Sequence, residues 1–93
     1  MIRTFADPET EHIWNRERSR KLPPDIQQRA IRRLTLLDAA ISLDDLTNPR
    51  GNRLHALKDD RAGQHSISIN DQWRICFVWK DGDAYDVEIT DYH

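Results

Sequence analysis

Trp73-Arg74-Ile75-Cys76-Phe77-Val78-Trp79 is the stretch that decides the fold. Large apolar side chains occupy every second position, so the stretch predicts a strand with Trp73, Ile75, Phe77 and Trp79 on one face. The residues that follow, Lys80-Asp81-Gly82-Asp83, are typical of a hairpin, because Asp-Gly readily adopts the positive φ angles of a two-residue turn. Beyond the turn, Tyr85, Val87 and Ile89 are expected to face the core.

Two helices are predicted ahead of this hairpin. The first begins at Asp7-Pro8, a capping residue followed by proline at the first helical position, and extends to about Arg16 with Ile13 and Trp14 turned inward. The second begins near Pro24 and extends to about Ile41. Its apolar residues recur at steps of three and four, which places them on one helical face. They are Ile26, Ala30, Leu34, Leu37 and Ile41.

Shorter strands are expected over residues 54–57 and 63–70, and residues 1–5 alternate as a short edge strand would. The sequence therefore predicts an α+β fold in a single domain of residues 1–93. Two N-terminal helices would pack on the aromatic face of a small antiparallel meander. We expect this sheet to carry the function.

The composition is that of a small globular protein. The chain has 93 residues, of which 38% are hydrophobic and 32% are charged. No apolar run approaches the roughly 18 residues of a membrane span, and residues 1–7 lack the features of a signal peptide. The lone Cys76 cannot form an internal disulfide, and its apolar neighbours favour a small core residue over a nucleophile. A soluble cytoplasmic protein without membrane contact is expected.

Positive charge is concentrated in one part of the chain. The net charge is -2, which argues against a general electrostatic affinity for nucleic acid. Residues 18–33 nevertheless contain six basic residues and one acidic residue, a local balance of +5. Arg29, Arg32 and Arg33 are the candidate RNA-binding residues of this segment. A solvated helix face is the alternative interpretation.

Several common site motifs are absent from the sequence. It contains no glycine-rich phosphate loop, no cysteine and histidine spacing typical of zinc sites, and no nucleophile elbow. These absences argue against dinucleotide cofactors, structural zinc and serine-hydrolase chemistry.

Arg74 and His55 are candidate chemical groups within the sheet. Alternation places Arg74 on the face opposite the aromatic residues, where its planar guanidinium suits a phosphoryl group. A cross-strand salt bridge with Asp86 or Glu88 is the alternative. His55 can exchange a proton near neutral pH, although a structural histidine is the alternative there. Lys58, three residues further on, adds a cation that can reach the same anion.

The chain closes with Asp91-Tyr92-His93, directly after a core strand. All three side chains can take part in proton transfer. A short exposed tail is the alternative, because most chain termini are frayed.

Four segments of the sequence resemble HigB toxins, one branch of the RelE/ParE superfamily of bacterial toxin–antitoxin systems. They are Gly51-Asn52-Arg53-Leu54-His55-Ala56-Leu57-Lys58, Gln64-His65-Ser66-Ile67-Ser68-Ile69, Gln72-Trp73-Arg74-Ile75 and Val87-Glu88-Ile89-Thr90-Asp91-Tyr92-His93. The similarity extends over the whole chain. The segment Leu-His-x-Leu-Lys and the terminal Asp-Tyr-His are its most specific parts.

The resemblance implies a RelE-like fold and a toxin that cleaves mRNA in the ribosomal decoding site without a metal or other cofactor. It also implies a HigA-type helix-turn-helix antitoxin that blocks the toxin and, together with it, binds operator DNA. By position, the residues that the resemblance assigns to function are His55, Arg74, Asp91, Tyr92 and His93. Lys58 is a weaker addition.

This chemistry needs a base, an acid and a group that stabilises negative charge, because the 2′-OH of the RNA is itself the nucleophile. We expect Asp91 or His55 to act as the base. Arg74 and Lys58 would stabilise charge on the phosphate. His93 or Tyr92 would act as the acid, or Tyr92 would stack on a base.

Two other functions share this fold. ParE proteins poison DNA gyrase and do not cut RNA, and a weakly toxic member would act mainly as a co-repressor with its antitoxin. His55 and the terminal Asp91-Tyr92-His93 favour the nuclease, because a gyrase inhibitor has no need of clustered proton-transfer groups.

Overall fold

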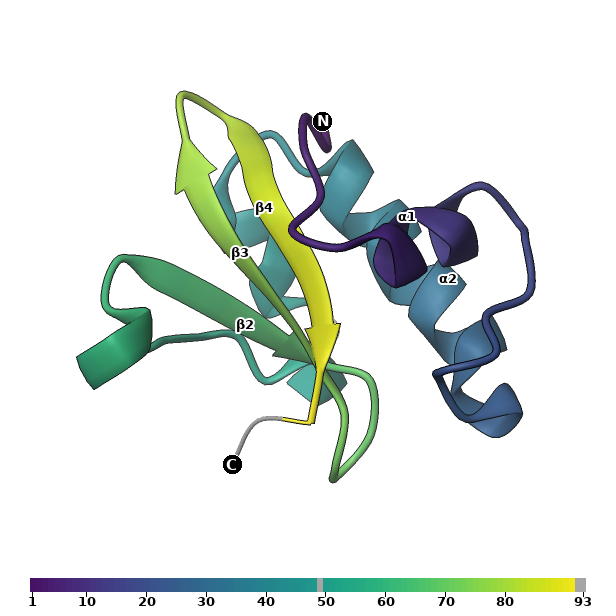
Figure 1. The fold of residues 1–93 in the computed structure, drawn as a ribbon. Helices are drawn as coiled ribbons and strands as arrows, with labels where there is room; N and C mark the ends of the chain where they lie inside the picture. Colours follow the sequence, from purple (N-terminus) through teal and green to yellow (C-terminus); the bar gives the residue numbers. More distant parts are fainter. Residues whose placement is uncertain (49, 92–93) are drawn as a thin grey trace.

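Two helices lie on one side of a four-stranded antiparallel sheet in the computed structural model, which describes residues 1–48 and 50–91 (Figure 1). The helices are α1 (Pro8–Trp14) and α2 (Pro24–Ala39). The strands follow chain order across the sheet; they are β1 (His55–Ala56), β2 (Gln64–Ser68), β3 (Arg74–Lys80) and β4 (Asp83–Thr90). The predicted α+β meander is confirmed. Pro49, Tyr92 and His93 fall outside the described residues.

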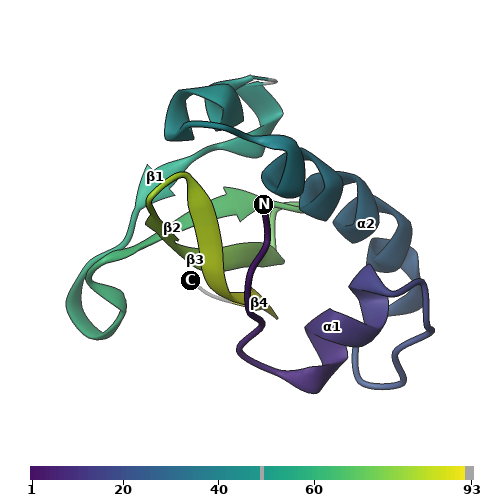
Figure 2. The same ribbon diagram turned by 90° about the horizontal axis from the view of Figure 1, so that it is seen from above.

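Figure 2 shows from above that the helices lie on one side of the sheet. The buried hydrophobic cluster includes residues of the helices and of the sheet, so the core lies between them. Ile75 and Phe77 of β3 are fully buried, and Leu34 and Leu37 of α2 belong to the same buried cluster. Trp73 and Trp79 pack against the edges of this cluster. The aromatic face of the sheet therefore receives the helices, as predicted. No helix within the described ranges is both long and apolar enough to cross a bilayer.

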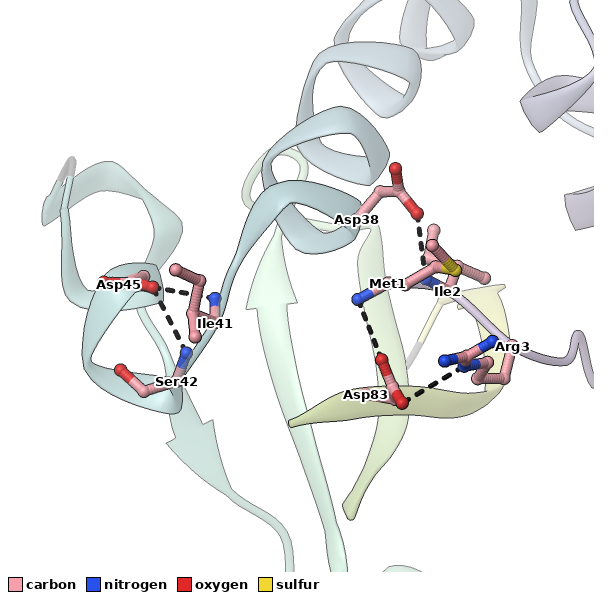
Figure 3. A network of polar contacts seen from close by, with 8 residues as sticks. All are labelled: Met1, Ile2, Arg3, Asp38, Ile41, Ser42, Asp45 and Asp83. Carbon is pink, nitrogen blue, oxygen red and sulfur yellow. Dashed lines mark hydrogen bonds and ion pairs between the residues drawn. The ribbon is translucent and has the colours of Figure 1, made fainter. Parts of the chain in front are cut away.

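Helix α2 ends two residues earlier than predicted. Ala39 is its last residue, and Ile41, expected in the core, is 83% exposed. The Asp45 carboxylate accepts hydrogen bonds from the backbone N–H groups of Ile41 and Ser42, at 2.8 and 3.2 Å (Figure 3). These contacts begin the next helical turn, Leu43–Thr47, and direct the chain away from the axis of α2.

The start of helix α1 also differs from the prediction. Asp7 occupies the N-cap position with extended backbone, but its side chain makes no capping hydrogen bond. Its expected capping role is therefore wrong, although Pro8 does occupy the first helical turn. The helix ends at Trp14, two residues before the predicted end, because Arg16 adopts a left-handed backbone with φ of 65°. Ile13 is buried as expected, and Trp14 is half-buried against the core.

A β-bulge in β4 overturns the prediction that Tyr85 faces the core. Tyr85 pairs with Val78, on the sheet face turned away from the helices. The pairing register shifts between Cys76 and Val78, and Asp86 has φ of 52°. The extra residue at this bulge lets Ala84 and Val87 both face the core, with Tyr85 outside it.

The N-terminal segment lies beside β4 as two isolated parallel bridges, Ile2 with Ala84 and Phe5 with Val87, and not as a regular strand. Polar contacts bind this segment to β4 on one side and to α2 on the other (Figure 3). Asp83 pairs with the Met1 amino group at 3.2 Å and with Arg3 Nε at 3.1 Å. The Ile2 backbone N–H donates to Asp38 of α2 at 2.9 Å. The segment thus connects the sheet to α2.

Asp83 makes folding stability depend on pH. Hydrogen bonds from Arg3 and from the Met1 amino group lower the pKa of this carboxyl in the folded protein. Its contribution is therefore present above its unfolded pKa, about 3.9, and is lost as the pH falls through the lower folded pKa. We expect Asp83→Asn to lower the urea midpoint at pH 7 and the difference from the parent protein to vanish toward pH 2.

Asp81→Asn is the matched control for this measurement, because Asp81 is an exposed turn residue in the same hairpin and asparagine tolerates its φ of 53°. Equal shifts of the midpoint for the two variants at pH 7 would contradict the assignment to Asp83.

Candidate active site

The sheet face turned away from the helices carries a row of polar side chains across all four strands. Directly opposed residues of antiparallel strands project from the same face. The register places His55 of β1 opposite Ser66, Ser66 opposite Cys76, and Cys76 opposite Glu88 of β4. Arg74 lies in the next row, between Ser68 and Thr90. We call this surface the helix-free face.

Arg74 is half-buried on the helix-free face and contacts a neutral group. Its Nη1 donates to Ser66 Oγ at 3.4 Å, a long and therefore weak hydrogen bond. Glu88, one of the two expected salt-bridge partners, pairs instead with Arg61 at 3.1 Å. Asp86, the other, lies at the exposed bulge. Among residues 1–48 and 50–91 no carboxylate forms a salt bridge with this guanidinium, which therefore has donors available for an anionic ligand.

His55 and Lys58 line one depression of about 250 Å³ at the β1 edge of the sheet. Both side chains are exposed, so His55 is not a core residue. Its Nδ1 lies 3.2 Å from the carbonyl oxygen of Arg53. A proton on Nδ1 would bind that carbonyl and leave the Nε2 lone pair directed outward, which is the form that a general base needs. That Lys58 reaches the same anion as His55 stays a prediction, and the shared depression is compatible with it.

Asp91 follows the end of β4 and is exposed. Its Oδ2 accepts a hydrogen bond from Gln72 Nε2 at 3.0 Å, which ties it to the turn between β2 and β3. Thr90, the preceding residue, is paired with Arg74, so Asp91 and Arg74 belong to the same end of the sheet. The other two residues of the predicted site, Tyr92 and His93, lie outside the described residues.

Ser66 lies between His55 and Arg74. It is fully buried, stands opposite His55 in the register and accepts the hydrogen bond from Arg74. The fold thus places His55 and Arg74, from separate strands, on the helix-free face, with Lys58 beside His55 and Asp91 beyond the end of β4 next to Arg74.

Arg61 is a residue of this face that the sequence did not indicate. It belongs to the short helical turn Asp59–Arg61, yet it reaches Glu88 on β4 at 3.1 Å and Gln64 on β2 at 3.1 Å. The partners Arg61 and Glu88 are 27 residues apart in the chain, so no local pattern reveals the pair. This contact holds the loop after Lys58 against the sheet.

Cys76 lies beneath these charges and is fully buried. Burial is the main reason why the pKa of its thiol is raised, and Glu88 raises it further, whereas Arg61 and Arg74 lower it. A nucleophilic cysteine needs a thiolate. The environment of Cys76 favours the neutral thiol, in agreement with a core residue.

The three arginines predicted to bind RNA lie on α2 and divide into two groups. Arg29 and Arg33 line a pocket against the β2–β3 turn, and Arg32 is exposed on the same helix but outside that pocket. Arg33 Nε donates to the carbonyl oxygen of Ser68 at 3.0 Å. Burial, and secondly the charge of Arg29, lower the pKa of Arg33.

Residues 1–48 and 50–91 contain no group of three or more His, Cys, Asp or Glu side chains placed to hold a metal ion.

Comparison with known proteins identifies the family. The model of the HigB-like toxin family, described as the RelE-like toxin of type II toxin–antitoxin system HigB, matches residues 3–93. This chain is a member of that family. Its sequence is 38% identical over 85 residues to Toxin HigB-1 of Vibrio cholerae, covering 90% of each chain. It is 33% identical to Endoribonuclease HigB of Proteus vulgaris over the full length of both chains.

Solved structures support the RelE-like fold of this HigB-like toxin. The YoeB–YefM complex from Staphylococcus aureus contains a chain that matches with a TM-score of 0.62 at 14% identity, covering 100% of this chain and 98% of the other. A YafQ mutant from E. coli matches with a TM-score of 0.61 at 11% identity, covering 98% and 93%. At such low identity, these likenesses concern the fold alone.

Replacing Cys76 tests its role in this toxin. Cys76→Ala removes a buried sulfur and should destabilise the fold by about 1–2 kcal/mol, as a small cavity does. Because the buried thiol is neutral, growth inhibition on induction should persist in cells held well below the unfolding temperature. Abolished toxicity in a variant whose thermal unfolding remains cooperative would assign Cys76 to the chemistry.

Proposed function

We propose that this toxin is an endoribonuclease that cleaves mRNA in the decoding site of the ribosome. The observation that carries the proposal is the placement of Arg74 on the helix-free face, between the depression of His55 and Lys58 and the end of β4 that bears Asp91. The full-length relative named an endoribonuclease supports it.

The cleavage step has a nucleophile supplied by the RNA. The 2′-OH oxygen attacks the adjacent phosphorus while the bond from phosphorus to the 5′ oxygen breaks, which yields a 2′,3′-cyclic phosphate and a 5′-OH. Asp91 or His55 takes the 2′-OH proton. Arg74 and Lys58 stabilise the added negative charge, to which a guanidinium fork is well suited.

The acid of this reaction is assigned to the last two residues. His93 or Tyr92 gives a proton to the leaving 5′ oxygen, and Tyr92 can alternatively stack on a base.

The solvent exposure of the candidate site and the net charge of the toxin both support dependence on the ribosome. His55, Lys58 and Asp91 are exposed, and the net charge is -2. Such a protein has little general attraction for RNA. The ribosome would hold the mRNA in a reactive geometry and present RNA to Arg29, Arg32 and Arg33.

The partner that neutralises the toxin is proposed to be a HigA-type helix-turn-helix antitoxin. Membership of a toxin–antitoxin family supports an antitoxin partner, as does the fold shared with a chain of the YoeB–YefM complex. Operator DNA would be bound only through the toxin–antitoxin complex. The ribosome places the action of the toxin in the cytoplasm.

The proposal is tested with purified toxin, one defined mRNA and a bacterial translation extract, with and without ribosomes. New 5′ ends are mapped in both reactions. We expect cuts in register with the reading frame and only where ribosomes are present. Intact mRNA in both reactions, together with inhibited supercoiling by gyrase, would instead support a ParE-like toxin. Intact mRNA with active gyrase would support a co-repressor.

Substitution of Arg74 should separate chemistry from folding. We expect Arg74→Ala to lower the single-turnover cleavage rate on ribosomes by about 10²–10³-fold, because a donor to the developing charge is lost. Lys80→Ala, which removes one positive charge at the exposed hairpin end of β3, is the matched control and should cleave normally.

The same assay extends to the last residue of the chain. His93→Ala should lose cleavage while it keeps its thermal midpoint and its binding to the antitoxin. Normal cleavage by this variant would remove His93 from the site.

A further inference from the structure

A small basic pocket lies beside the β2–β3 turn. Its volume is about 180 Å³, and its lining includes Arg29 and Arg33 of α2 together with Arg53 and Asp71. We call this site the arginine pocket. Three guanidinium groups around one hollow repel one another, and an anion bound among them would relieve this repulsion.

Arg33 is fixed within the arginine pocket. Its Nε donates to the Ser68 carbonyl at 3.0 Å. Across residues 1–48 and 50–91, we find no carboxylate paired with Arg29 or Arg33. These two positive charges, four residues apart on one helix, repel each other, and their repulsion is not balanced by a counter-ion there.

Arg53 completes the pocket from a strained position. Its φ of 48° is in the left-handed region, which a residue with a side chain rarely adopts. Its Nη1 is 3.4 Å from Asp71 Oδ1, and the Asp71 side chain is 96% exposed. So exposed an ion pair is weak and readily exchanged. The carboxylate of Asp71 therefore occupies the rim of the pocket as a replaceable anion.

The β2–β3 turn joins the arginine pocket rigidly to the candidate active site. Asn70 Oδ1 accepts hydrogen bonds from the backbone N–H groups of Gln72 and Trp73, at 2.9 and 2.7 Å. Asp71 in this turn faces Arg53, and the next residue, Gln72, binds Asp91. The pocket and Asp91 thus contact neighbouring residues of the same turn.

We propose that the arginine pocket binds a phosphate group of RNA and that Asp71 competes with this phosphate for Arg53. The inference deepens the proposed function and rests on it, since the RNA is the one brought to the active site. It adds Arg53 as a binding residue and Asp71 as an internal competitor. The phosphate comes from the mRNA strand or from ribosomal RNA, and the experiment distinguishes these sources.

The test measures binding of the full chain to a fluorescent 12-nucleotide single-stranded RNA and to purified small ribosomal subunits, each over a series of salt concentrations. Arg29→Ala and Arg53→Asn should weaken binding and lower the salt slope by about 1 each, as the loss of one phosphate contact does. Asparagine is chosen at Arg53 because it tolerates a left-handed backbone. Asp71→Asn should tighten binding by about 2- to 5-fold, the worth of an exposed ion pair.

Lys80→Ala removes the same charge far from the pocket and should leave the salt slope unchanged. Effects in both binding assays would identify the mRNA strand as the source, and effects confined to the ribosomal subunits would identify ribosomal RNA. The inference would be overturned if Arg29→Ala and Arg53→Asn showed the same salt dependence of binding as Lys80→Ala in both assays. So would unchanged RNA binding with weakened antitoxin binding, because the pocket would then receive an acidic side chain.

This readout is independent of catalysis. If the parent toxin fails to cut mRNA but the salt slopes behave as expected, the proposed cleavage is wrong and the phosphate pocket stands. If the toxin cuts mRNA and the slopes do not change, the pocket is wrong and the cleavage stands.

Discussion

The burial of one face of β3 against α2 is the constraint on which the rest of the structure depends. Ile75 and Phe77 are fully buried, so the residues that alternate with them must project from the opposite face. A slip of one residue would bury Arg74 and expose Phe77, at a cost of several kcal/mol. The hydrophobic core therefore determines which residues form the helix-free face. An arginine on a central strand is tolerable there because α1 and α2 both pack on the other face of the sheet.

The sequence predicted those parts of the fold that depend on a local repeat. The apolar steps of α2 and the alternation of β3 led to the right elements, and Asp81 and Gly82 form the expected turn with φ of 53° and 81°. Predictions failed where a single bulge or side-chain hydrogen bond interrupted the periodic pattern of apolar residues. The bulge at Asp86 turned Tyr85 outward, and the Asp45 carboxylate drew Ile41 out of the helix. Neither event has a periodic signal.

The candidate site likewise contains residues that the sequence predicted and residues that it did not. Residue type and alternation were enough to single out His55, Arg74 and Asp91. The structure puts His55 and Arg74 on one face of the sheet and Asp91 just beyond the end of β4. The Arg61–Glu88 pair was missed, because its partners are distant in sequence and each looks like an ordinary surface charge. Charge pairs of this kind become visible only when the sheet register is known.

Backbone strain marks the segment that carries His55 and Lys58. Arg53 and Asp59, on either side of it, both have left-handed backbones, each of which costs on the order of 1–3 kcal/mol. The two-residue strand β1 contributes too little pairing to offset this alone. Leu57 supplies the anchor, since its side chain is buried and its N–H donates to the Gln64 carbonyl at 2.9 Å. The segment thus holds two exposed polar side chains on a fixed backbone, which suits a protein that works on RNA positioned by a larger partner.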